Sequence, residues 1–219
     1  MASKGMKFSA PCPAASVESG FVHTDHHRAE IARTVDAIVP VDGLEAEHRR
    51  AVLEWVDSGV PLCRLVPPDQ PPMHLVSCFV PCDPATGAVL LTAHRKSGLA
   101  LPPGGHCEPG ELPWQTVRRE CEEELGLPAV ALPSLGAEPL FVTVTETQGP
   151  TVRKHTDVSL WYVIELARTD ARLRPDPGEF DGVRWVSFDE LLAEPIEGMD
   201  PHMHRFARKL GTAMGFNDA

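Results

Sequence analysis

The sequence predicts a mixed α/β protein that begins with a helical extension. Three observations support this prediction. Apolar residues recur at helical spacing before residue 60, strand-like apolar runs follow residue 72, and a Pro-rich stretch lies between the two regions. The 219 residues, 42% of them hydrophobic, suffice for one large domain or one domain plus an extension. We therefore expect residues 1–70 to form a disordered start and a helical extension, and residues 71–219 to form the α/β domain.

The first part of the chain is expected to hold two amphipathic helices. Residues 1–20 are small and polar, which predicts disorder. Helical spacing predicts one helix over 25–38 and another over 43–57, with Asp42 as the N-cap of the second. The buried stripe of the second helix is expected to comprise Leu44, Val52, Trp55 and Val56. Because such helices need an apolar partner, they should pack on the α/β domain or on the second subunit of a homodimer.

The rest of the chain is expected to alternate between strands and helices. Apolar runs separated by turn residues predict strands over 74–82, 88–94, 139–146, 156–166 and 182–187. Ser187 and Glu190 form a capping box that predicts a short helix, and a last helix should start at Asp200 and end at Gly215.

The composition excludes several classes of function and location. A formal net charge of −11 disfavours a general nucleic-acid partner, because the chain would repel the phosphate backbone. Six scattered cysteines in a chain of this length are expected to be reduced thiols. No stretch is apolar and long enough to cross a membrane, and the N-terminus lacks the apolar run of a signal peptide. We therefore expect a cytoplasmic protein without a membrane partner.

A helix with an unusual charge pattern is expected after the glycines at 104 and 105. Pro113 suits its first turn and Gly126 its end. The apolar stripe that anchors this helix is expected to comprise Trp114, Val117, Cys121 and Leu125. Next to the stripe, Glu120, Glu123 and Glu124 converge on one edge of the helix.

That concentration of carboxylates works against its own helix. Like charges three and four residues apart repel, and carboxylates near a helix C-terminus oppose the macrodipole. A divalent cation would neutralise the cluster, and magnesium prefers such oxygen ligands. The alternative is a solvated acidic face, which is common for runs of glutamate. Glu122, which points away from the other three, is expected to be such a solvated charge.

The segment from Gly105 to Leu127 fits the pattern G-x5-E-x7-R-E-U-x-E-E-x-G-U, where U is an apolar position. The matching residues are Gly105, Glu111, Arg119, Glu120, Cys121, Glu123, Glu124, Gly126 and Leu127. This pattern resembles the signature of the Nudix hydrolases, which cleave a nucleoside diphosphate linked to another moiety. Cys121 is the one departure, because an aliphatic residue is usual there. The resemblance implies an α/β/α sandwich with a mixed sheet, and its softer part extends over roughly residues 72–192.

The resemblance also implies roles for the matched residues. Glu120, Glu123 and Glu124, with the backbone carbonyl of Gly104, would bind magnesium, or manganese as an alternative. Arg119 would orient these carboxylates together with Glu111. The catalytic set is thus Glu111, Arg119, Glu120, Glu123 and Glu124. The base that activates water stays open between Glu124 and a carboxylate outside the matched segment, for which Glu146, Asp157 and Glu179 are available.

A small phosphorylated substrate is expected to contact positively charged and aromatic side chains of this acidic chain. Two basic spots, one that includes Arg153 and one at Arg95-Lys96, could bind its phosphates. For both, a solvated loop without a ligand is at least as good an interpretation. His155, Asp157 and Trp161 alternate onto one face of a predicted strand, so they are candidates for substrate binding. Trp161 would stack a base, or else it belongs to the core. The remaining histidine groups, His23, His26 and His27 and then His202 and His204, are interpreted as surface residues.

These expectations lead to one preferred function and two alternatives. The preferred function is a magnesium-dependent pyrophosphohydrolase of a nucleotide or nucleoside-diphosphate-linked substrate. A diphosphate isomerase on the same fold would need its own cysteine and glutamate, and no cysteine here lies in a matching motif. A non-catalytic nucleotide sensor would often lack residues of the matched segment, which is intact here.

Overall fold

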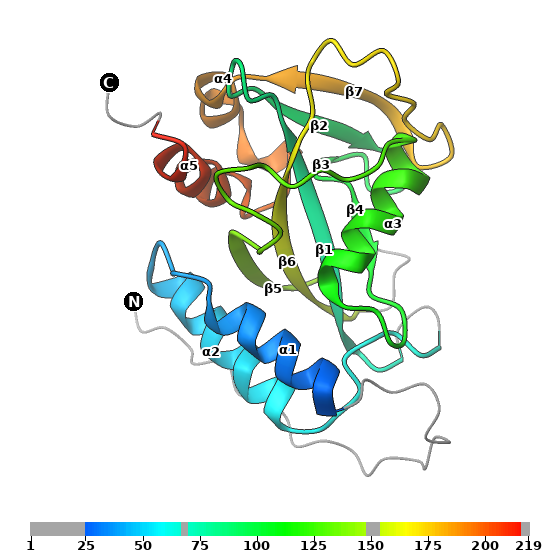
Figure 1. Ribbon diagram of the computed structural model, residues 1–219, viewed down its shortest axis with the longest axis vertical. Helices are drawn as coiled ribbons and strands as arrows, with labels where there is room; N and C mark the ends of the chain where they lie inside the picture. The colour runs from blue at the N-terminus through cyan, green and yellow to red at the C-terminus, as the bar shows by residue number, and fades with distance from the viewer. Residues whose placement is uncertain (1–24, 67–69, 148–153, 216–219) are drawn as a thin grey trace.

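The computed structural model describes residues 25–66, 70–147 and 154–215 and shows a seven-stranded mixed sheet with helices on both faces (Figure 1). The predicted α/β/α class and the N-terminal helical extension are therefore confirmed. The disorder predicted for residues 1–20 lies outside the described residues.

The sheet is built around two long parallel neighbours, β1 and β6. Its strands are β1 (Met73–Cys82), β2 (Val89–His94), β3 (Ala100–Leu101), β4 (Gly104–His106), β5 (Phe141–Glu146), β6 (Thr156–Glu165) and β7 (Phe180–Val186). The main order is β3-β2-β1-β6-β5, while β4 pairs with β1 and β7 pairs with β2. All pairs except β1 with β6 are antiparallel. The five predicted strands are present, and the short β3 and β4 were not predicted.

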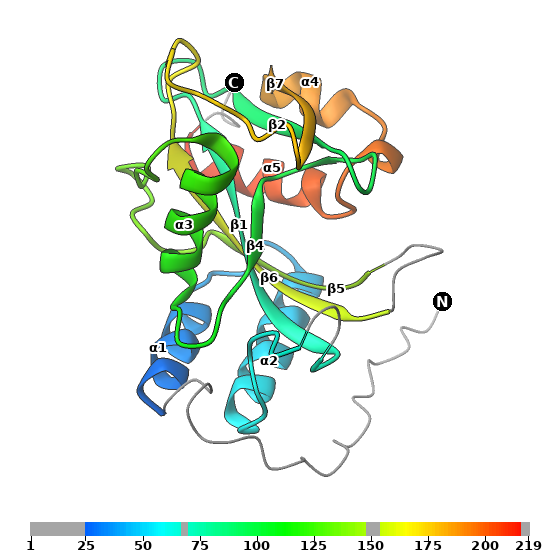
Figure 2. The same cartoon turned by 90° about the vertical axis from the view of Figure 1, so that its right-hand side faces the viewer.

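The helices divide between the two faces of the sheet (Figures 1 and 2). They are α1 (Asp25–Asp36), α2 (Gly43–Asp57), α3 (Pro113–Leu125), α4 (Phe188–Ala193) and α5 (Met203–Ala213), with a 3-10 turn at Ile196–Gly198. Buried residues of α1, α2 and α3 share one apolar cluster with the sheet, whereas residues of α4 and α5 belong to a second cluster. One face therefore carries the extension and the acidic helix, and the other carries the C-terminal helices.

The start of α2 confirms one expectation and corrects another. The Asp42 side chain caps the helix by accepting a hydrogen bond of 2.8 Å from the Glu45 backbone N–H. Leu44, however, is 41% exposed, so its predicted burial is wrong. The buried stripe continues toward the N-terminus through His48 and Glu45 instead. Glu45 tolerates burial because its carboxylate accepts a hydrogen bond of 2.6 Å from Lys209 Nζ of α5.

The extension packs on the sheet. Ile31 and Val35 of α1 and Val52 of α2 lie in the same buried cluster as Phe79 of β1 and Val142 of β5. Of the two partners considered for the amphipathic helices, the structure provides the α/β part of the same chain. Residues 67–69 of the Pro-rich stretch lie outside the described residues, so the division at residue 70 stays a prediction.

Two further findings concern the described residues. None of their helices combines the length and the apolar character that a membrane crossing requires. Cys63, Cys78, Cys82, Cys107 and Cys121 are buried free thiols. Cys12 lies outside the described part of the chain.

Candidate active site

The acidic helix α3 is fixed at both ends by residues that suit those positions. Pro113 occupies its first turn, and Gly126 ends it in the left-handed region at φ 69°. Val117, Cys121 and Leu125 are buried against the sheet, as their spacing predicts. With this stripe anchored, the carboxylates on the adjacent edge are directed toward the loop that contains β4.

Two of these carboxylates meet the backbone of the paired glycines. The Gly104 backbone N–H donates a hydrogen bond of 2.8 Å to Glu124 Oε2. A Cβ atom at Gly105 would lie 2.0 Å from Glu120 Oε1, and one at Gly104 would lie 2.4 Å from the Ser77 carbonyl oxygen. Gly104 also adopts φ +143°, a conformation that L side chains rarely take. The backbone therefore requires glycine at 104, and at 105 a side chain would displace the Glu120 carboxylate.

Arg119 connects the carboxylates to one another. Its Nε and Nη2 atoms donate to the two oxygens of Glu111 at 2.8 and 3.0 Å. Its Nη1 atom donates to Glu120 at 2.7 Å and to Glu123 at 3.3 Å. The contact with Glu111 raises the pKa of Arg119 above its usual value. The guanidinium thus stays charged and contacts all three carboxylates, while its role in orienting them for catalysis stays a prediction.

The electrostatics of the group favour a bound cation. Burial, reinforced by the charge of Glu120, raises the pKa of Glu124 to about 8. Burial also raises the pKa of Glu120, although the Arg119 guanidinium opposes the shift. Removing like-charged carboxylates from water is unfavourable unless a cation compensates them. Oxygen donors that converge on a glycine backbone fit magnesium, whereas Glu122 is exposed on the helix surface as predicted.

A cavity of about 210 Å³ adjoins the glycines. Its lining includes Gly104, Gly105, His106, Asp157, Ser159, Trp161 and Asp200. A larger cavity of about 280 Å³ lies beside Leu127 and Glu165. No carboxylate of α3 lines either cavity, but Gly104 and Gly105, whose backbone Glu124 and Glu120 approach, line the smaller one.

The predicted substrate residues differ in their placement. Asp157 and Trp161 line the cavity. His155 contacts Asp157, with its Nε2 atom 3.4 Å from Oδ1. Arg153 lies outside the described residues. The Trp161 side chain is only 1% exposed, and its Nε1 atom donates to Thr143 Oγ1 at 3.0 Å. So little ring surface favours the core interpretation, and the stacking role of Trp161 stays a prediction.

The candidate bases outside the matched segment Gly105–Leu127, called the box from here on, also lie in different surroundings. Glu146 is 61% exposed and pairs with Lys154 at 3.9 Å. Asp157 belongs to a group of histidines described below. Glu179 accepts a hydrogen bond of 2.9 Å from Lys96 Nζ, and its charge contributes to the raised pKa of Glu124. Of the three, Glu179 is thus electrostatically coupled to the box.

Three polar residues of this region were not predicted. Asp200 lines the cavity, and burial raises its pKa to about 6. His106 also lines the cavity, and burial lowers its pKa to about 4. His74, whose side chain is fully buried, lies beside His106 with ring centroids 4.6 Å apart. His106 could have been found from its position directly after the glycines, whereas His74 and Asp200 reach the site only through strand pairing and chain folding.

Comparisons with solved structures return proteins of low sequence identity. The Escherichia coli ORF135 protein has a TM-score of 0.48 at 21% identity, with 67% of this chain and 94% of that chain covered. A NUDIX-family hydrolase from Clostridium perfringens has a TM-score of 0.45 at 22% identity, covering 65% and 96%. A C. elegans Ap4A hydrolase complex has a TM-score of 0.48 at 16% identity, covering 64% and 97%. No curated protein matches the sequence.

A family model of the NUDIX domain matches residues 72–210, which is more than half of the chain. The match includes the whole box, every residue that lines the cavity and all seven strands, from β1 at Met73 to β7 at Val186. The chain therefore belongs to the Nudix family, and it is a hydrolase of phosphoric anhydride bonds.

Proposed function

We propose that this Nudix protein is a magnesium-dependent pyrophosphohydrolase of a nucleotide or a nucleoside-diphosphate-linked substrate. One observation carries the proposal: Glu120 and Glu124 of α3 meet the Gly104–Gly105 backbone at the wall of the cavity. This arrangement supplies oxygen donors for a hard cation next to a space that a phosphorylated ligand can enter.

The residues of the chain hold and orient rather than react covalently. Magnesium bound by Glu120, Glu123 and Glu124 would neutralise the substrate diphosphate and polarise its phosphoryl oxygens. Glu111 fixes the Arg119 guanidinium, which in turn holds Glu120 in place. Manganese, which takes the same oxygen donors, is the expected substitute ion.

We infer that a carboxylate of this group accepts the proton of the attacking water. Glu124 lies within the box, and Glu179 is coupled to it from outside. The two roles separate experimentally, because loss of a metal ligand raises the magnesium concentration that gives half-maximal activity. Loss of a base that binds no metal instead lowers kcat at saturating magnesium. The variants Glu124→Gln and Glu179→Gln, each titrated with magnesium, distinguish the two residues.

The non-phosphate end of the substrate would extend along the cavity from the glycines. Asp157 and Ser159 of β6 offer polar contacts on this path, and the Trp161 ring forms part of its wall. Because the cavity is small, at about 210 Å³, we expect it to enclose one planar group rather than a whole dinucleotide.

A panel of nucleoside triphosphates, dinucleoside polyphosphates and nucleoside-diphosphate conjugates tests this function. Released phosphate, pyrophosphate and nucleotide would be measured with and without magnesium. We expect at least one substrate to be cleaved only when the ion is present, and a Glu120→Gln, Glu124→Gln double variant to be inactive. Equal cleavage without divalent ions, or no cleavage of any diphosphate linkage with magnesium or manganese, would contradict the proposal.

A further inference from the structure

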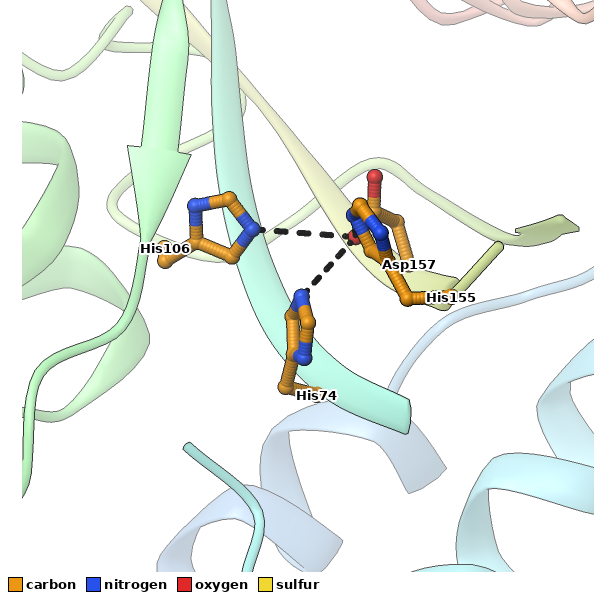
Figure 3. A group of neighbouring side chains, drawn as sticks. All are labelled: His74, His106, His155 and Asp157. Carbon is orange, nitrogen blue, oxygen red and sulfur yellow. Dashed lines mark ion pairs between the residues drawn. The ribbon is translucent and has the colours of Figure 1, made fainter. Parts of the chain in front are cut away.

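A second group of potential ligands lies outside the Nudix box, on the three neighbouring strands β4, β1 and β6 (Figure 3). It comprises His74, His106, His155 and Asp157. One ligand atom from each residue lies within 4.8 Å of the others. His74 stands on β1, His106 on β4 and Asp157 on β6, while His155 immediately precedes β6.

The register of the strands brings these residues together. In the parallel pair of β1 and β6, His74 lies opposite Asp157. In the antiparallel pair of β1 and β4, His106 lies opposite Val76, which is two residues from His74 and therefore on the same face. Backbone pairing between β4, β1 and β6 thus fixes the relative positions of His74, His106 and Asp157.

Several polar atoms at the centre of the group lack a hydrogen-bond partner among the described residues. They are Nε2 of His74, Nε2 of His106 and Oδ1 of Asp157, and the His74 side chain is 0% exposed. The three imidazole Nε2 atoms of His74, His155 and His106 surround Asp157 Oδ1 at 3.3, 3.4 and 3.8 Å. Burying polar atoms without partners is costly, so their convergence points to a bound species.

The outer ring nitrogens of His74 and His155 have the contacts that metal-binding histidines need. His74 Nδ1 lies 3.0 Å from the Pro71 carbonyl oxygen, which can only accept a hydrogen bond. The Nδ1 atom must therefore carry the proton, and in the neutral ring Nε2 presents its lone pair to the group. His155 Nδ1 similarly contacts Thr147 Oγ1 at 3.2 Å. Such outer contacts fix the tautomer and the orientation of metal-binding imidazoles.

We propose that His74, His106, His155 and Asp157 bind a transition-metal ion of the zinc type, at a site separate from the Glu cluster. Imidazole nitrogens suit zinc and its neighbours, whereas magnesium prefers oxygen. Zinc–nitrogen bonds of about 2.0–2.1 Å in a tetrahedron place ligand atoms about 3.3 Å apart. The observed contacts to Asp157 Oδ1, 3.3 to 3.8 Å, are close to that spacing, so small side-chain rotations suffice to complete the site.

Four protein ligands make this a closed, structural type of site. The ion would join β1, β4 and β6 where His106 and Asp157 border the cavity. It would thereby fix the strand that carries Gly104 and Gly105 without taking part in the phosphoryl chemistry.

Cobalt(II) is the probe for this site, because its visible spectrum reports tetrahedral coordination. The untagged full chain would be stripped of metal and titrated with Co²⁺, and Zn²⁺ would then be added in competition. We expect one tetrahedral Co²⁺ per chain that Zn²⁺ displaces, and the same spectrum in the Glu120→Gln variant. Loss of a hydrogen-bond partner of a metal ligand weakens metal binding roughly 10- to 100-fold. His106→Gln and Asp157→Asn remove a ligand itself, so each should weaken Co²⁺ binding by at least as much.

His94→Gln is a matched control for His106→Gln. Both side chains are 26% exposed, and both lie 3.8 Å from a carboxylate oxygen, that of Glu179 for His94 and that of Asp157 for His106. The control should bind Co²⁺ like the unchanged chain. Thermal unfolding of each metal-free variant, followed by circular dichroism, shows whether it is folded.

The proposal is overturned if the full chain gives no tetrahedral Co²⁺ spectrum. It is equally overturned if the folded His106→Gln and Asp157→Asn variants bind Co²⁺ as the unchanged chain does. In either case the group is an imidazole–carboxylate cluster without an ion. Neither result bears on the proposed hydrolysis, which depends on the Glu cluster and is measured with magnesium.

Discussion

The box carboxylates of this chain are held where they are unfavourable in the absence of a cation. Glu120 and Glu124 approach a backbone that has no side chains to separate them from it, and burial raises the pKa of both. Arg119 compensates part of the charge through its contacts with Glu111 and Glu120. A cation that balances the remaining negative charge would explain why glutamates that disfavour their own helix are nevertheless placed on it.

Gly105→Ala tests the contact between loop and helix. The new methyl group would lie 2.0 Å from Glu120 Oε1, so the Glu120 carboxylate must move. Because the obstructing atoms are the end of a side chain, we expect a small loss of thermal stability but at least a roughly 10-fold loss of kcat/KM, as about 1.4 kcal/mol of lost transition-state stabilisation implies.

Gly43→Ala is the control for that change, since a Cβ atom at Gly43 meets nothing within 4 Å. It should leave both the unfolding curve and the kinetics unchanged. A Gly105→Ala enzyme with the activity of the unchanged chain would show that the position of Glu120 is not critical.

The residues of the box could be predicted from the sequence because their chemistry depends on spacing within one helix and one loop. Glu120, Glu123 and Glu124 are neighbours along the chain, so helical geometry alone places them together. The pairing of His74 with Asp157, 83 positions apart in the sequence, depends instead on the parallel register of β1 and β6. A single sequence contains no signal that fixes such a register, and this is why the histidine group was missed.

At the scale of secondary-structure elements, β6 has two different faces. Its Asp157, Ser159 and Trp161 side chains border the cavity, while Val158 and Leu160 are buried beneath α1, α2 and α3. Along the first face the surroundings change from polar to apolar, because Trp161 packs against Phe206 of α5 with ring centroids 5.0 Å apart. The alternation predicted for this strand is therefore present, but the depth of Trp161 was not evident from it.

Trp161→Ala distinguishes a core residue from a stacking residue. Its 1% exposure predicts a loss of about 3–5 kcal/mol in the free energy of unfolding, with KM little changed. A stacking role would instead raise KM roughly 5- to 150-fold, which corresponds to about 1–3 kcal/mol. Chemical denaturation and steady-state kinetics of the same preparation decide between the two. An unchanged stability with a raised KM would show that the ring face reaches the substrate.

The elements were predictable where a single strong local signal defines them. The Asp42 cap, the Ser187–Glu190 capping box and the Gly126 terminus all occur as expected. The short strands β3 and β4 were missed because two or three residues carry no periodicity. Leu44 was misplaced because a buried ion pair, Glu45 with Lys209, takes the position that an apolar residue would normally fill.

On the scale of the whole molecule, the N-terminal helices are part of the folded core. Apolar residues of α1 and α2 cover the same face of the sheet as α3. Two ion pairs also join α2 to α5: Arg205 with Asp42, and Lys209 with Glu45, each at 2.6 Å. None of the ligands of the candidate metal sites comes from α1 or α2. We therefore expect the extension to contribute stability and the box to contribute the chemistry.

A chain that begins at Pro71 tests this division. It would keep the box but expose the apolar face that α1 and α2 cover, including Phe79 and Val142. We expect a lower unfolding temperature and self-association, measured by thermal scanning and by light scattering. Any chain that stays folded and monomeric should still cleave the substrate with magnesium. A stable, monomeric truncated chain would contradict the shared core.

The stability of the whole chain should fall in mild acid, partly through His202. Arg205 Nη1 donates to His202 Nδ1 at 2.9 Å, which requires a ring without a proton there, and burial lowers the His202 pKa to about 4. The unfolded chain therefore takes up the proton first, near pH 6.5. Between about pH 6.5 and 4 the His202 contribution falls, by at most about 1.4 kcal/mol per pH unit and by less where solvent screens the half-buried ring, and it is fully present above this range.

Urea unfolding of the metal-free chain across that pH range measures the dependence. His202→Asn, which cannot titrate, should give a shallower slope than the unchanged chain. Equal slopes would mean that His202 takes up its proton in the folded and unfolded states alike. His202 was predicted to be a surface residue, but it is half-buried. Its ring packs edge-on against His48 with centroids 5.6 Å apart.

The magnesium dependence of hydrolysis in the Glu124→Gln variant tests the proposed catalytic metal site most directly. The amide keeps the shape of the side chain but removes the charge, and Glu122→Gln on the exposed side of α3 is its matched control. We predict that Glu124→Gln loses at least about 10²–10³-fold in kcat, comparable to removing one preorganised transition-state contact. Glu122→Gln should stay fully active. Near-normal, magnesium-dependent turnover by a folded Glu124→Gln enzyme would contradict the assignment of the Glu cluster as the catalytic metal site.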